Sequence, residues 1–306
     1  MIVVYGYADD EPIRRAVEVL AGLRADYLVV DPRRLDLHDL VVGVGIDEWM
    51  RVDGRQVALS EVTSVYARPL TPRASEPGEA ARARADAFGD AFVGWLDTAD
   101  ALVVNRPSAM ESNGSKPYQA QLIAAAGFRV PETLVTSDPD EVLDFRREHG
   151  RIVFKSISGI RSIVRELRDE DLPRLPLISS VPVQFQRYLP GRDVRVHVVG
   201  EATFAAVIDS AATDYRYAER EGAQTTMRPF ALPDEIARRC VEVTEHLGLV
   251  LSGVDLRLGA DGAWTCFEVN PMPAYSYFEA HTGLPIAAAL GEMLSRAGDR
   301  ETAGIG

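Results

Sequence analysis

An acidic segment near the C-terminus contains the residues with the clearest potential for chemistry. The dipeptide Asp261-Gly262 is typical of a two-residue type I′ hairpin loop, in which both residues have a positive φ. Counting outward from such a loop places Asp255 directly opposite Glu268, and Asn270 follows two residues later on the same face. Directly opposed like charges destabilise a strand pair, so we expect a cation between them. Oxygen ligands of this kind suit Mg²⁺ or Mn²⁺ shared with substrate phosphates. The alternative is an exposed hairpin with scattered acids.

Two lysines form a second group with a distinct chemistry. Lys116 and Lys155 are the only lysines among 33 lysine and arginine residues. Lysine is a compact point charge on a flexible stem, which suits it to phosphate oxygens. Lys116 stands where a helix is predicted to begin, so helix N–H groups would favour an anion there. Lys155 ends a predicted strand, just before the small-residue turn Ser156–Gly159. We expect both to contact phosphates, against the alternative of two solvated surface charges.

A strand pair in the second half of the chain adds an arginine to this set. Residues 182–200 predict a strand, a short linker and a second strand in which Val194, Val196 and Val198 face one side. Arg195 and His197 therefore face the other side. With carboxylates nearby, Arg195 would complement a polyanion. A lone strand histidine is usually structural, so we assign His197 no catalytic role.

At these residues the chain resembles the ATP-grasp superfamily, in particular the branch of amino-acid-adding ligases and graspetide (microviridin-type) macrocyclases. The resemblance runs from about Asn105 to Glu279. Each of its parts is a weak signal, whereas seven parts in the family's order are a strong one. They are Asn105 with Ser115-Lys116-Pro117, Gly127–Thr133, Phe154-Lys155, Phe185–Leu189 with Asp193–Arg195, Asp214–Arg216, Asp255, and Phe267–Pro271.

The resemblance implies ATP as cosubstrate and two Mg²⁺ ions, which Mn²⁺ could replace. It also implies a role for each matching position. Phosphates would be bound by Lys116 and Lys155. The hinge beside adenine would be formed by Gln186, Arg187, Tyr188 and Leu189, with Asp193 at the ribose end. The catalytic residues that face the triphosphate and the activated carboxylate would be Arg195 and Arg216, and the metal would be held by Asp255, Glu268 and Asn270. The family commonly has an acidic residue where this chain has Arg187, so we expect recognition there through the backbone and not through the side chain.

The reaction that the resemblance implies begins when a carboxylate attacks the γ-phosphate of ATP and gives an acyl phosphate and ADP. An amine or hydroxyl then displaces phosphate. Because an acyl phosphate hydrolyses easily, we expect a closing lid that excludes water, with Gly159 at its tip. Arg68 and Arg161 are candidate carboxylate clamps. The segment after the acidic hairpin, with Tyr275 and Ser276, should line the acceptor side, although its aromatic residues suit packing better than ligand contact.

The order of the predicted elements indicates an α/β fold with α+β lobes, which would be the ATP-grasp fold. Residues 1–108 alternate strands and helices, which predicts a small parallel sheet in an N-terminal pre-ATP-grasp domain. Residues 109–182 predict a central lid subdomain, and residues 183–306 predict a C-terminal ATP-grasp subdomain. A dinucleotide-binding fold is not supported, because no G-x-G-x-x-G motif occurs.

Composition fits a globular enzyme and excludes other classes. Among 306 residues, 46% are hydrophobic, and the net charge of -13 argues against nucleic-acid binding, which needs a basic surface. No apolar run approaches the ~20 residues of a membrane span, and the first residues read as a strand and not as a signal peptide. Cys240 and Cys266 have no metal-binding spacing and are expected to be reduced, buried thiols of a cytoplasmic protein. We expect neither nucleic acid nor membrane as a partner, and a homodimer is compatible with the sequence.

The leading hypothesis is an ATP-dependent carboxylate–amine ligase that forms an amide bond on an amino acid, a small peptide or a peptide-like metabolite. One alternative is a graspetide-type macrocyclase, which would form lactams or esters in a ribosomal precursor peptide. A second alternative is a nucleotide-binding protein without turnover. The two lysines, Arg195 and the complete set of Asp255, Glu268 and Asn270 argue against this last alternative.

Overall fold

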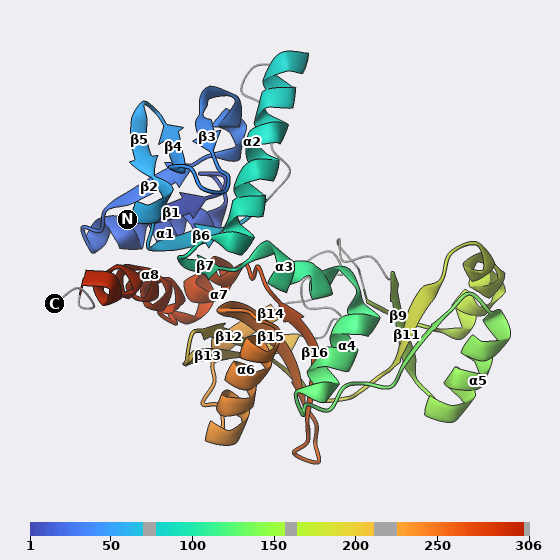
Figure 1. Cartoon of the computed structure of the whole chain (residues 1–306). Coiled ribbons are helices and arrows are strands. Elements are labelled where there is room, and N and C mark those ends of the chain that lie inside the picture. Colours follow the sequence, from blue (N-terminus) through green and yellow to red (C-terminus); the bar gives the residue numbers. More distant parts are fainter. Residues whose placement is uncertain (70–77, 157–163, 211–224, 303–306) are drawn as a thin grey trace.

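The computed structural model describes residues 1–69, 78–156, 164–210 and 225–302. Its strands form four sheets, and the three that build the body of the molecule follow one another along the chain (Figure 1). The N-terminal sheet and the C-terminal sheet lie side by side, and a small sheet extends to one side together with α5. Among the described helices, none is both long enough and apolar enough to cross a membrane.

The N-terminal sheet is parallel, as its alternating strand and helix signals predict. Its strand order is β2-β1-β6-β7, and both of its faces are buried. Phe92 and Trp95 of α2 pack on one face, and Ile13 and Leu20 of α1 pack on the other. The elements are β1 (Ile2–Tyr5), α1 (Glu11–Gly22), β2 (Tyr27–Val30), β6 (Ser64–Ala67), α2 (Glu79–Thr98) and β7 (Leu102–Val104).

A small antiparallel sheet in the same domain was not foreseen from the sequence. It contains β3 (Asp39–Val41), β4 (Trp49–Val52) and β5 (Arg55–Ala58), flanked by the short 3₁₀ helices η1 (Pro32–Leu37) and η2 (Leu59–Glu61). Its last two strands meet at a two-residue loop, because Val52 pairs with Arg55. Both loop residues, Asp53 and Gly54, have a positive φ, of 50° and 82°. A type I′ turn on an Asp-Gly dipeptide therefore occurs here.

The middle of the chain forms a separate antiparallel sheet, which we call the central sheet, with the order β10-β9-β11-β8. One of its faces carries an apolar core that includes Phe185 and Ile152 and packs against Val142 of α5 and Leu175 of η4. Gly150 ends α5 with a φ of 74°. The elements are β8 (Thr133–Thr136), α5 (Pro139–His149), β9 (Ile152–Ser156), β10 (Arg165–Glu166), η4 (Asp169–Ser180) and β11 (Val183–Arg187).

The C-terminal sheet has five antiparallel strands in the order β14-β13-β12-β15-β16. Helix α6 packs on one face, while α7 and α8 cover one end of the other face and separate it from the N-terminal sheet (Figure 1). The elements are β12 (Arg192–Val199), β13 (Ala202–Ser210), β14 (Thr225–Pro229), α6 (Asp234–His246), β15 (Leu251–Leu258), β16 (Trp264–Asn270), α7 (Tyr275–Thr282) and α8 (Ile286–Thr302).

The segment between the N-terminal and central sheets packs differently from the expected lid that begins at residue 109. It contains α3 (Pro107–Met110), η3 (Glu111–Gly114) and α4 (Lys116–Ala125). Ile123 of α4 and the following Phe128 lie in the core of the C-terminal sheet, beside Val196 and Val269. In its packing, α4 is therefore part of the C-terminal lobe. The chain leaves that lobe only at β8, because the central sheet needs its own apolar core.

The acidic hairpin brings the expected residues together by a different route. Its loop has five residues, because Leu258 pairs with Trp264, and only Gly262 of the Asp-Gly pair has a positive φ. This loop shifts the register by one residue relative to the predicted two-residue turn. A β-bulge between Asp255 and Leu256 then shifts it back, and Asp255 pairs with Glu268 as predicted.

One buried side chain connects the N-terminal sheet to the C-terminal sheet. Asn105, directly after β7, donates hydrogen bonds to the carbonyls of Leu251 (2.7 Å) and Pro271 (2.6 Å). Its amide oxygen accepts from the N–H groups of Val250 and Leu251. The full hydrogen-bonding capacity of the Asn105 amide is thus used to hold β7 against the ends of the strands that carry the acidic residues.

Candidate active site

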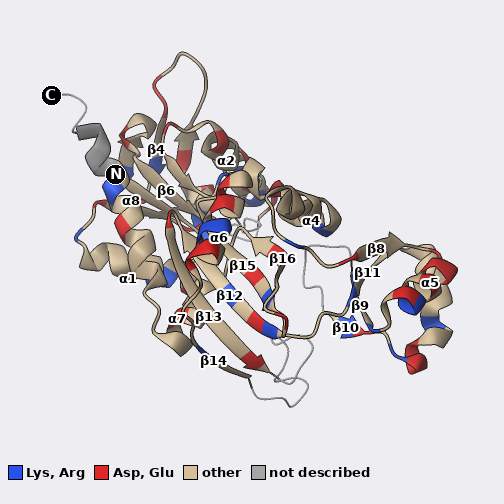
Figure 2. Ribbon diagram, turned by 90° about the horizontal axis from the view of Figure 1, so that it is seen from below, with Lys and Arg blue, Asp and Glu red and all other residues tan. Residues whose placement is uncertain are grey.

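Charged residues lie at neighbouring positions on β12, β15 and β16 of the C-terminal sheet (Figure 2), and the strand registers place them in an array on one face. Successive rows across β12 and β15 pair His197 with Gly253, Arg195 with Asp255, and Asp193 with Arg257. On β16, Asn270 lies opposite Gly253 and Glu268 lies opposite Asp255. Strand periodicity puts the valines of β12 on the opposite face, in the core with α6. The sheet therefore presents the predicted metal ligands, Arg195 and Asp193 on a single surface.

Arg195 and Asp255 form an ion pair in the middle row. Nη1 of Arg195 lies 2.7 Å from Oδ1 of Asp255, and the Arg195 side chain is only 6% exposed. The guanidinium extends along the sheet past Gly253, where a Cβ atom would overlap it, and reaches within 5.7 Å of the centre of the Phe278 ring. Gly253 therefore gives the guanidinium its place. The sequence reasoning passed over this glycine, although a glycine inside a strand is a signal of close approach.

Lys116 and Glu268 form the second ion pair of this surface. Nζ of Lys116 lies 3.0 Å from Oε2 of Glu268, and both side chains are largely buried. Each of the two opposed carboxylates thus has a cationic partner from the protein itself. The expectation that their repulsion requires an external cation was incomplete, because Lys116 and Arg195 already offset it.

Arg257 forms a third ion pair at the end of the array nearest the central sheet. Its Nε lies 2.7 Å from Oδ1 of Asp193, and its Nη1 donates to the Leu189 carbonyl at 2.6 Å. The guanidinium also lies over the Phe267 ring, 5.4 Å from its centre. Arg257 was not among the predicted site residues. It fixes Asp193, the expected ribose contact, and the Leu189 carbonyl of the expected adenine hinge.

The inner face of the central sheet carries a buried lysine and two buried amides. Lys155 pairs with Gln184 across β9 and β11, and Gln186 lies on the same face two residues further along. All three are buried, and the apolar core with α5 is on the other face. This face therefore turns toward the C-terminal sheet (Figure 1). The amide oxygen of Gln184 is buried and has no hydrogen-bond partner among the residues that the structure describes, a signal that the sequence does not reveal.

The expected adenine hinge lies in the segment that connects the two sheets. The N–H of Arg187 donates to the Glu132 carbonyl, and the N–H of Tyr188 donates to the Arg151 carbonyl. The Arg187 side chain is exposed and lies 3.3 Å from a Glu132 carboxylate oxygen. The Tyr188 ring stacks against the Arg151 guanidinium, 3.8 Å from its centre. The side chain of Arg187 thus points to solvent, in keeping with the expectation that it has no side-chain role.

The remaining candidates differ in where the structure places them. Arg68 is largely buried, pairs with the Asp10 carboxylate and donates to the Pro273 carbonyl at 3.2 Å. Burial lowers the pKa of the Arg68 guanidinium, but Tyr66 and Asp10 outweigh this effect and hold that pKa above its usual value. Tyr275 is fully buried and donates to the Pro12 carbonyl, and Ser276 is 5% exposed, which favours packing roles for both. Arg161, Arg216 and Gly159 lie outside the described residues.

Comparison with known proteins shows to which family the chain belongs. A model of the RimK-like ATP-grasp domain matches residues 115–294, which is more than half of the chain. The chain belongs to the RimK-like ATP-grasp family. The expected ATP-grasp fold and the expected class of enzyme, an ATP-grasp ligase, are thereby confirmed.

Individual relatives of this ATP-grasp chain include ligases with different substrates. It is 27% identical to the alpha-aminoadipate–LysW ligase LysX of Sulfolobus acidocaldarius, over 60% of this chain and 69% of LysX. It is 26% identical to a probable alpha-L-glutamate ligase of Klebsiella pneumoniae, over 68% of this chain and 72% of that protein. A solved structure of the ATP-grasp ligase PsnB, complexed with a phosphomimetic variant of its minimal precursor, Mg and ADP, matches with a TM-score of 0.82. That match is 28% identical and covers 97% of this chain and 98% of PsnB.

The carboxylates of this ATP-grasp chain fit a magnesium site. Asp255 and Glu268 are directly opposed on adjacent strands, and their side chains remain 27% and 19% exposed. The amide oxygen of Asn270 accepts one hydrogen bond, from the N–H of Met272, and an amide oxygen has a second lone pair. Oxygen donors from two carboxylates and an amide are the kind that Mg²⁺ prefers. Lys116 lies close enough to Glu268 to exchange that carboxylate for a phosphate oxygen.

Buried titratable groups next to the array stay uncharged. Burial and the positive charge of Arg195 lower the pKa of His197 well below its usual value, and its ring packs edge-on against Phe278 at 4.8 Å. His197 is therefore a neutral imidazole at neutral pH and not a charged acid, which agrees with its predicted structural role. Burial raises the pKa of Cys240 to about 12 and that of Cys266 well above its usual value. Both cysteines are free, buried thiols, as expected.

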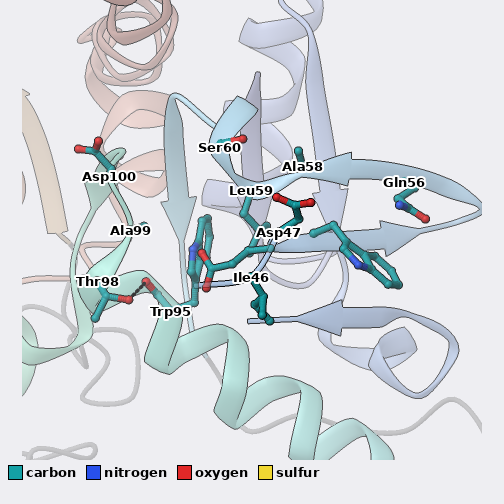
Figure 3. A pocket seen from close by; sticks show the side chains of 12 residues that line it. Ile46, Asp47, Gln56, Ala58, Leu59, Ser60, Trp95, Thr98, Ala99 and Asp100 are labelled. Atoms are coloured by element: carbon teal, nitrogen blue, oxygen red, sulfur yellow. Dashed lines mark hydrogen bonds between the residues drawn. The ribbon is translucent and has the colours of Figure 1, made fainter. Parts of the chain in front are cut away.

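A cavity of about 600 Å³ lies apart from this array, in the N-terminal domain. Trp95, Ile46 and Asp47 line it, together with residues of β4, β5 and η2 (Figure 3). None of its lining residues is a predicted site residue. The cavity therefore takes no part in the assignment of the ATP site.

Proposed function

We propose that this protein activates a carboxylate with ATP as an acyl phosphate and then joins it to an amine to form an amide bond. The observation that carries the proposal is the pair of facing surfaces. Arg195, Asp255 and Glu268 lie on the C-terminal sheet, with Lys116 of α4 beside them, and Lys155 lies on the inner face of the central sheet. Positive groups from both sides would converge on a triphosphate between them.

The nucleotide would lie with its base at the hinge and its phosphates over the charged array. Gln186, the backbone of residues 187–189 and Asp193 lie where the two sheets are connected, and Arg195 and the expected metal ligands lie further along the C-terminal sheet. Arg257 would keep Asp193 and the Leu189 carbonyl in place for the ribose and adenine.

In the first step, a substrate carboxylate oxygen attacks the γ-phosphorus, the bond to the β-phosphate oxygen breaks, and ADP leaves. Lys116 and Lys155 would orient the phosphate oxygens, and Arg195, with Arg216, would neutralise negative charge on the transferred group. The bound Mg²⁺ ions would supply further charge neutralisation. In the second step, the amine nitrogen attacks the acyl carbon, phosphate leaves, and the nitrogen loses a proton. The central sheet would exclude water from the acyl phosphate.

Oxygen labelling tests this mechanism directly. With an ¹⁸O-labelled carboxylate substrate, acyl-phosphate formation transfers one labelled oxygen to inorganic phosphate and gives ADP. Activation by adenylation would instead place the label in AMP and release pyrophosphate. A screen of amino acids and peptides for ADP release, with mass spectrometry of the product, would identify the substrate for this experiment. Label in AMP contradicts the proposed chemistry and leaves the fold assignment unchanged.

One observation favours a second candidate, in which the substrate is a ribosomal precursor peptide. The structure of PsnB matches this chain with a TM-score of 0.82 and 28% identity, whereas a D-alanine–D-alanine ligase of Bacillus anthracis, which also covers the whole chain, matches with a TM-score of 0.60 and 14% identity. PsnB is bound in that structure to a minimal precursor. A precursor peptide as substrate would give lactam or ester products within one chain. Product mass distinguishes the candidates, because cyclisation removes one water from a single peptide, whereas ligation joins two molecules.

A further inference from the structure

Gln119 stands out because its side chain hydrogen-bonds to a backbone segment 150 positions away. Its amide nitrogen donates to the carbonyl of Val269 at 2.8 Å, and its amide oxygen accepts from the N–H of Val269 at 3.2 Å. The Gln119 side chain is 2% exposed. A buried glutamine amide that pairs with both groups of one residue takes the place of a neighbouring strand.

The position of Val269 makes this pair important for the site. Strand β16 is at the edge of the C-terminal sheet, so the groups of Val269 that point away from β15 have no strand to pair with. Val269 lies between Glu268 and Asn270, two of the three expected metal ligands. The amide of Gln119 therefore supports the backbone of the strand at the point from which both ligands extend.

The same helix brings Lys116 to this strand. Lys116 is one helical turn before Gln119 on α4, so the two side chains lie on one face of the helix. Further along α4, Ile123 lies in the apolar core with Val269. Lys116 contacts Glu268 at 3.0 Å. A helix fixed at Val269 by Gln119 thus sets the distance between the lysine and the carboxylate.

We propose that Gln119 is a positioning residue of the metal and phosphate site, which locks α4 to the edge of β16 and holds Lys116 in register with Glu268 and Asn270. The proposal rests on the proposed function, in which Lys116 binds phosphate and the two β16 residues bind magnesium. Gln119 touches neither ligand. Its effect passes through the backbone of Val269 on one side and through the helix that carries Lys116 on the other.

Two variants and a control separate this role from general stability. Gln119→Leu keeps the approximate volume and removes both hydrogen bonds. Gln119→Glu keeps the shape of the side chain. A charged carboxylate at this position repels the Val269 carbonyl. A protonated carboxyl group can donate to that carbonyl and accept from the Val269 N–H, as the amide does. The matched control is Gln121→Leu, an exposed position on the same helix. Every other titratable group is the same in all four proteins.

The first measurement is hydrogen exchange of the β16 segment in the ligand-free protein. We expect Gln119→Leu to increase exchange at Val269, while Gln121→Leu leaves it unchanged. The second measurement is calorimetry of ADP binding with and without Mg²⁺. We expect Gln119→Leu to weaken the Mg²⁺-dependent part of the affinity about tenfold, as for the loss of one to two net hydrogen bonds. We expect the affinity of Gln119→Glu to recover toward the wild-type value as the pH is lowered from about 8 to about 6, relative to the wild-type curve.

Unchanged Val269 exchange in Gln119→Leu, or a pH dependence of Gln119→Glu equal to that of the wild type, would overturn the proposal. Failure of the proposed function is recognised separately. In that case the wild type itself shows no Mg²⁺-dependent nucleotide binding, and hydrogen exchange still decides whether Gln119 holds the edge of β16.

Discussion

The two sheets that face each other across the candidate site hold their charges in different ways. At the surface of the C-terminal sheet, Arg195 and Arg257 of the sheet and Lys116 of α4 are each paired with a carboxylate, at 2.7 to 3.0 Å. On the inner face of the central sheet, the basic side chain is Lys155, and its neighbours are the neutral amides of Gln184 and Gln186. The C-terminal sheet therefore presents a balanced, ordered surface, and the described part of the central sheet's inner face presents Lys155 beside two amides.

This difference indicates a division of labour in nucleotide binding. Under the proposed function, such a surface would take up a metal and a phosphate by exchange of partners. Lys116 would move from Glu268 to a phosphate oxygen when the metal binds the carboxylate, and Lys155 would contact phosphate from the other side. Variants of the C-terminal sheet should therefore affect turnover most, and variants of the central sheet should affect nucleotide affinity most.

The largest effect is expected for Glu268→Gln. The change keeps the shape of the side chain and removes the charge shared by Lys116 and the metal, so kcat should fall on the order of a hundredfold or more. Asp261→Asn is the matched control, because Asp261 is an exposed acid in the loop of the same hairpin. Steady-state kinetics at saturating Mg²⁺ decides this, with thermal unfolding to confirm the fold. Wild-type turnover in Glu268→Gln would exclude the metal assignment.

The next effect tests whether the order of the C-terminal sheet matters as much as its charges. Gly253→Ala adds a methyl group where the Arg195 guanidinium lies, so the arginine must move away from Asp255. A shift of about 1 Å at such a group can cost up to a hundredfold in rate, and we expect a tenfold to hundredfold loss of kcat. Gly94→Ala in α2, with open space around it, is the control. Equal kcat in both variants would show that Arg195 need not be held in this position.

A smaller effect, on affinity, is expected from the central sheet. Lys155→Ala removes its inner-face positive charge and should weaken binding of an ATP analogue about tenfold, the value of one charge-assisted hydrogen bond. Binding of the second substrate should change little. Arg165→Ala is a matched control, because Arg165 lies opposite Phe154 and thus on the outer face of the same sheet. Titration calorimetry measures both variants. An unchanged affinity in Lys155→Ala would mean that Lys155 does not contact phosphate and has only a structural role in the central sheet.

The two Asp-Gly dipeptides show how far the sequence predicts this site. The same signal gives a type I′ turn at Asp53-Gly54 and a five-residue loop at Asp261-Gly262. Local preference alone does not choose between them, because the bulge in the second hairpin depends on how β16 fits against its neighbours. The predicted pairing of Asp255 with Glu268 is nevertheless correct, because the bulge reverses the one-residue shift in register that the longer loop causes.

Other parts of the site were beyond sequence reasoning for a similar reason. The strands, the helices and the charged residues follow from periodicity and from rare residue types such as lysine. The contributions of Gly253, Gln119 and Arg257 depend on contacts between elements that are distant in the chain. A glycine, a glutamine and an arginine are common residues, and only tertiary structure shows that each fixes a neighbour of the array.

The smallest expected effect is on the pH dependence of stability. It arises at His197, which lies between the charged array and the apolar core. The pKa of His197 is lowered well below 6.5 in the folded protein, because burial and Arg195 disfavour its charged form. Below pH 6.5 His197 is protonated in the unfolded chain but stays neutral in the folded protein. The free energy of unfolding therefore decreases with falling pH until the pKa of the folded state is reached. The slope from one such group is at most about 1.4 kcal/mol per pH unit. His197→Gln should remove this part of the acid destabilisation, whereas His246→Gln, at an exposed position on α6, should retain it. Denaturant unfolding between about pH 7.5 and pH 5 measures the three slopes. If stability depends on pH in the same way in the wild type and in His197→Gln, His197 titrates normally in the folded protein. Water would then reach this side chain between the charged array and the apolar core.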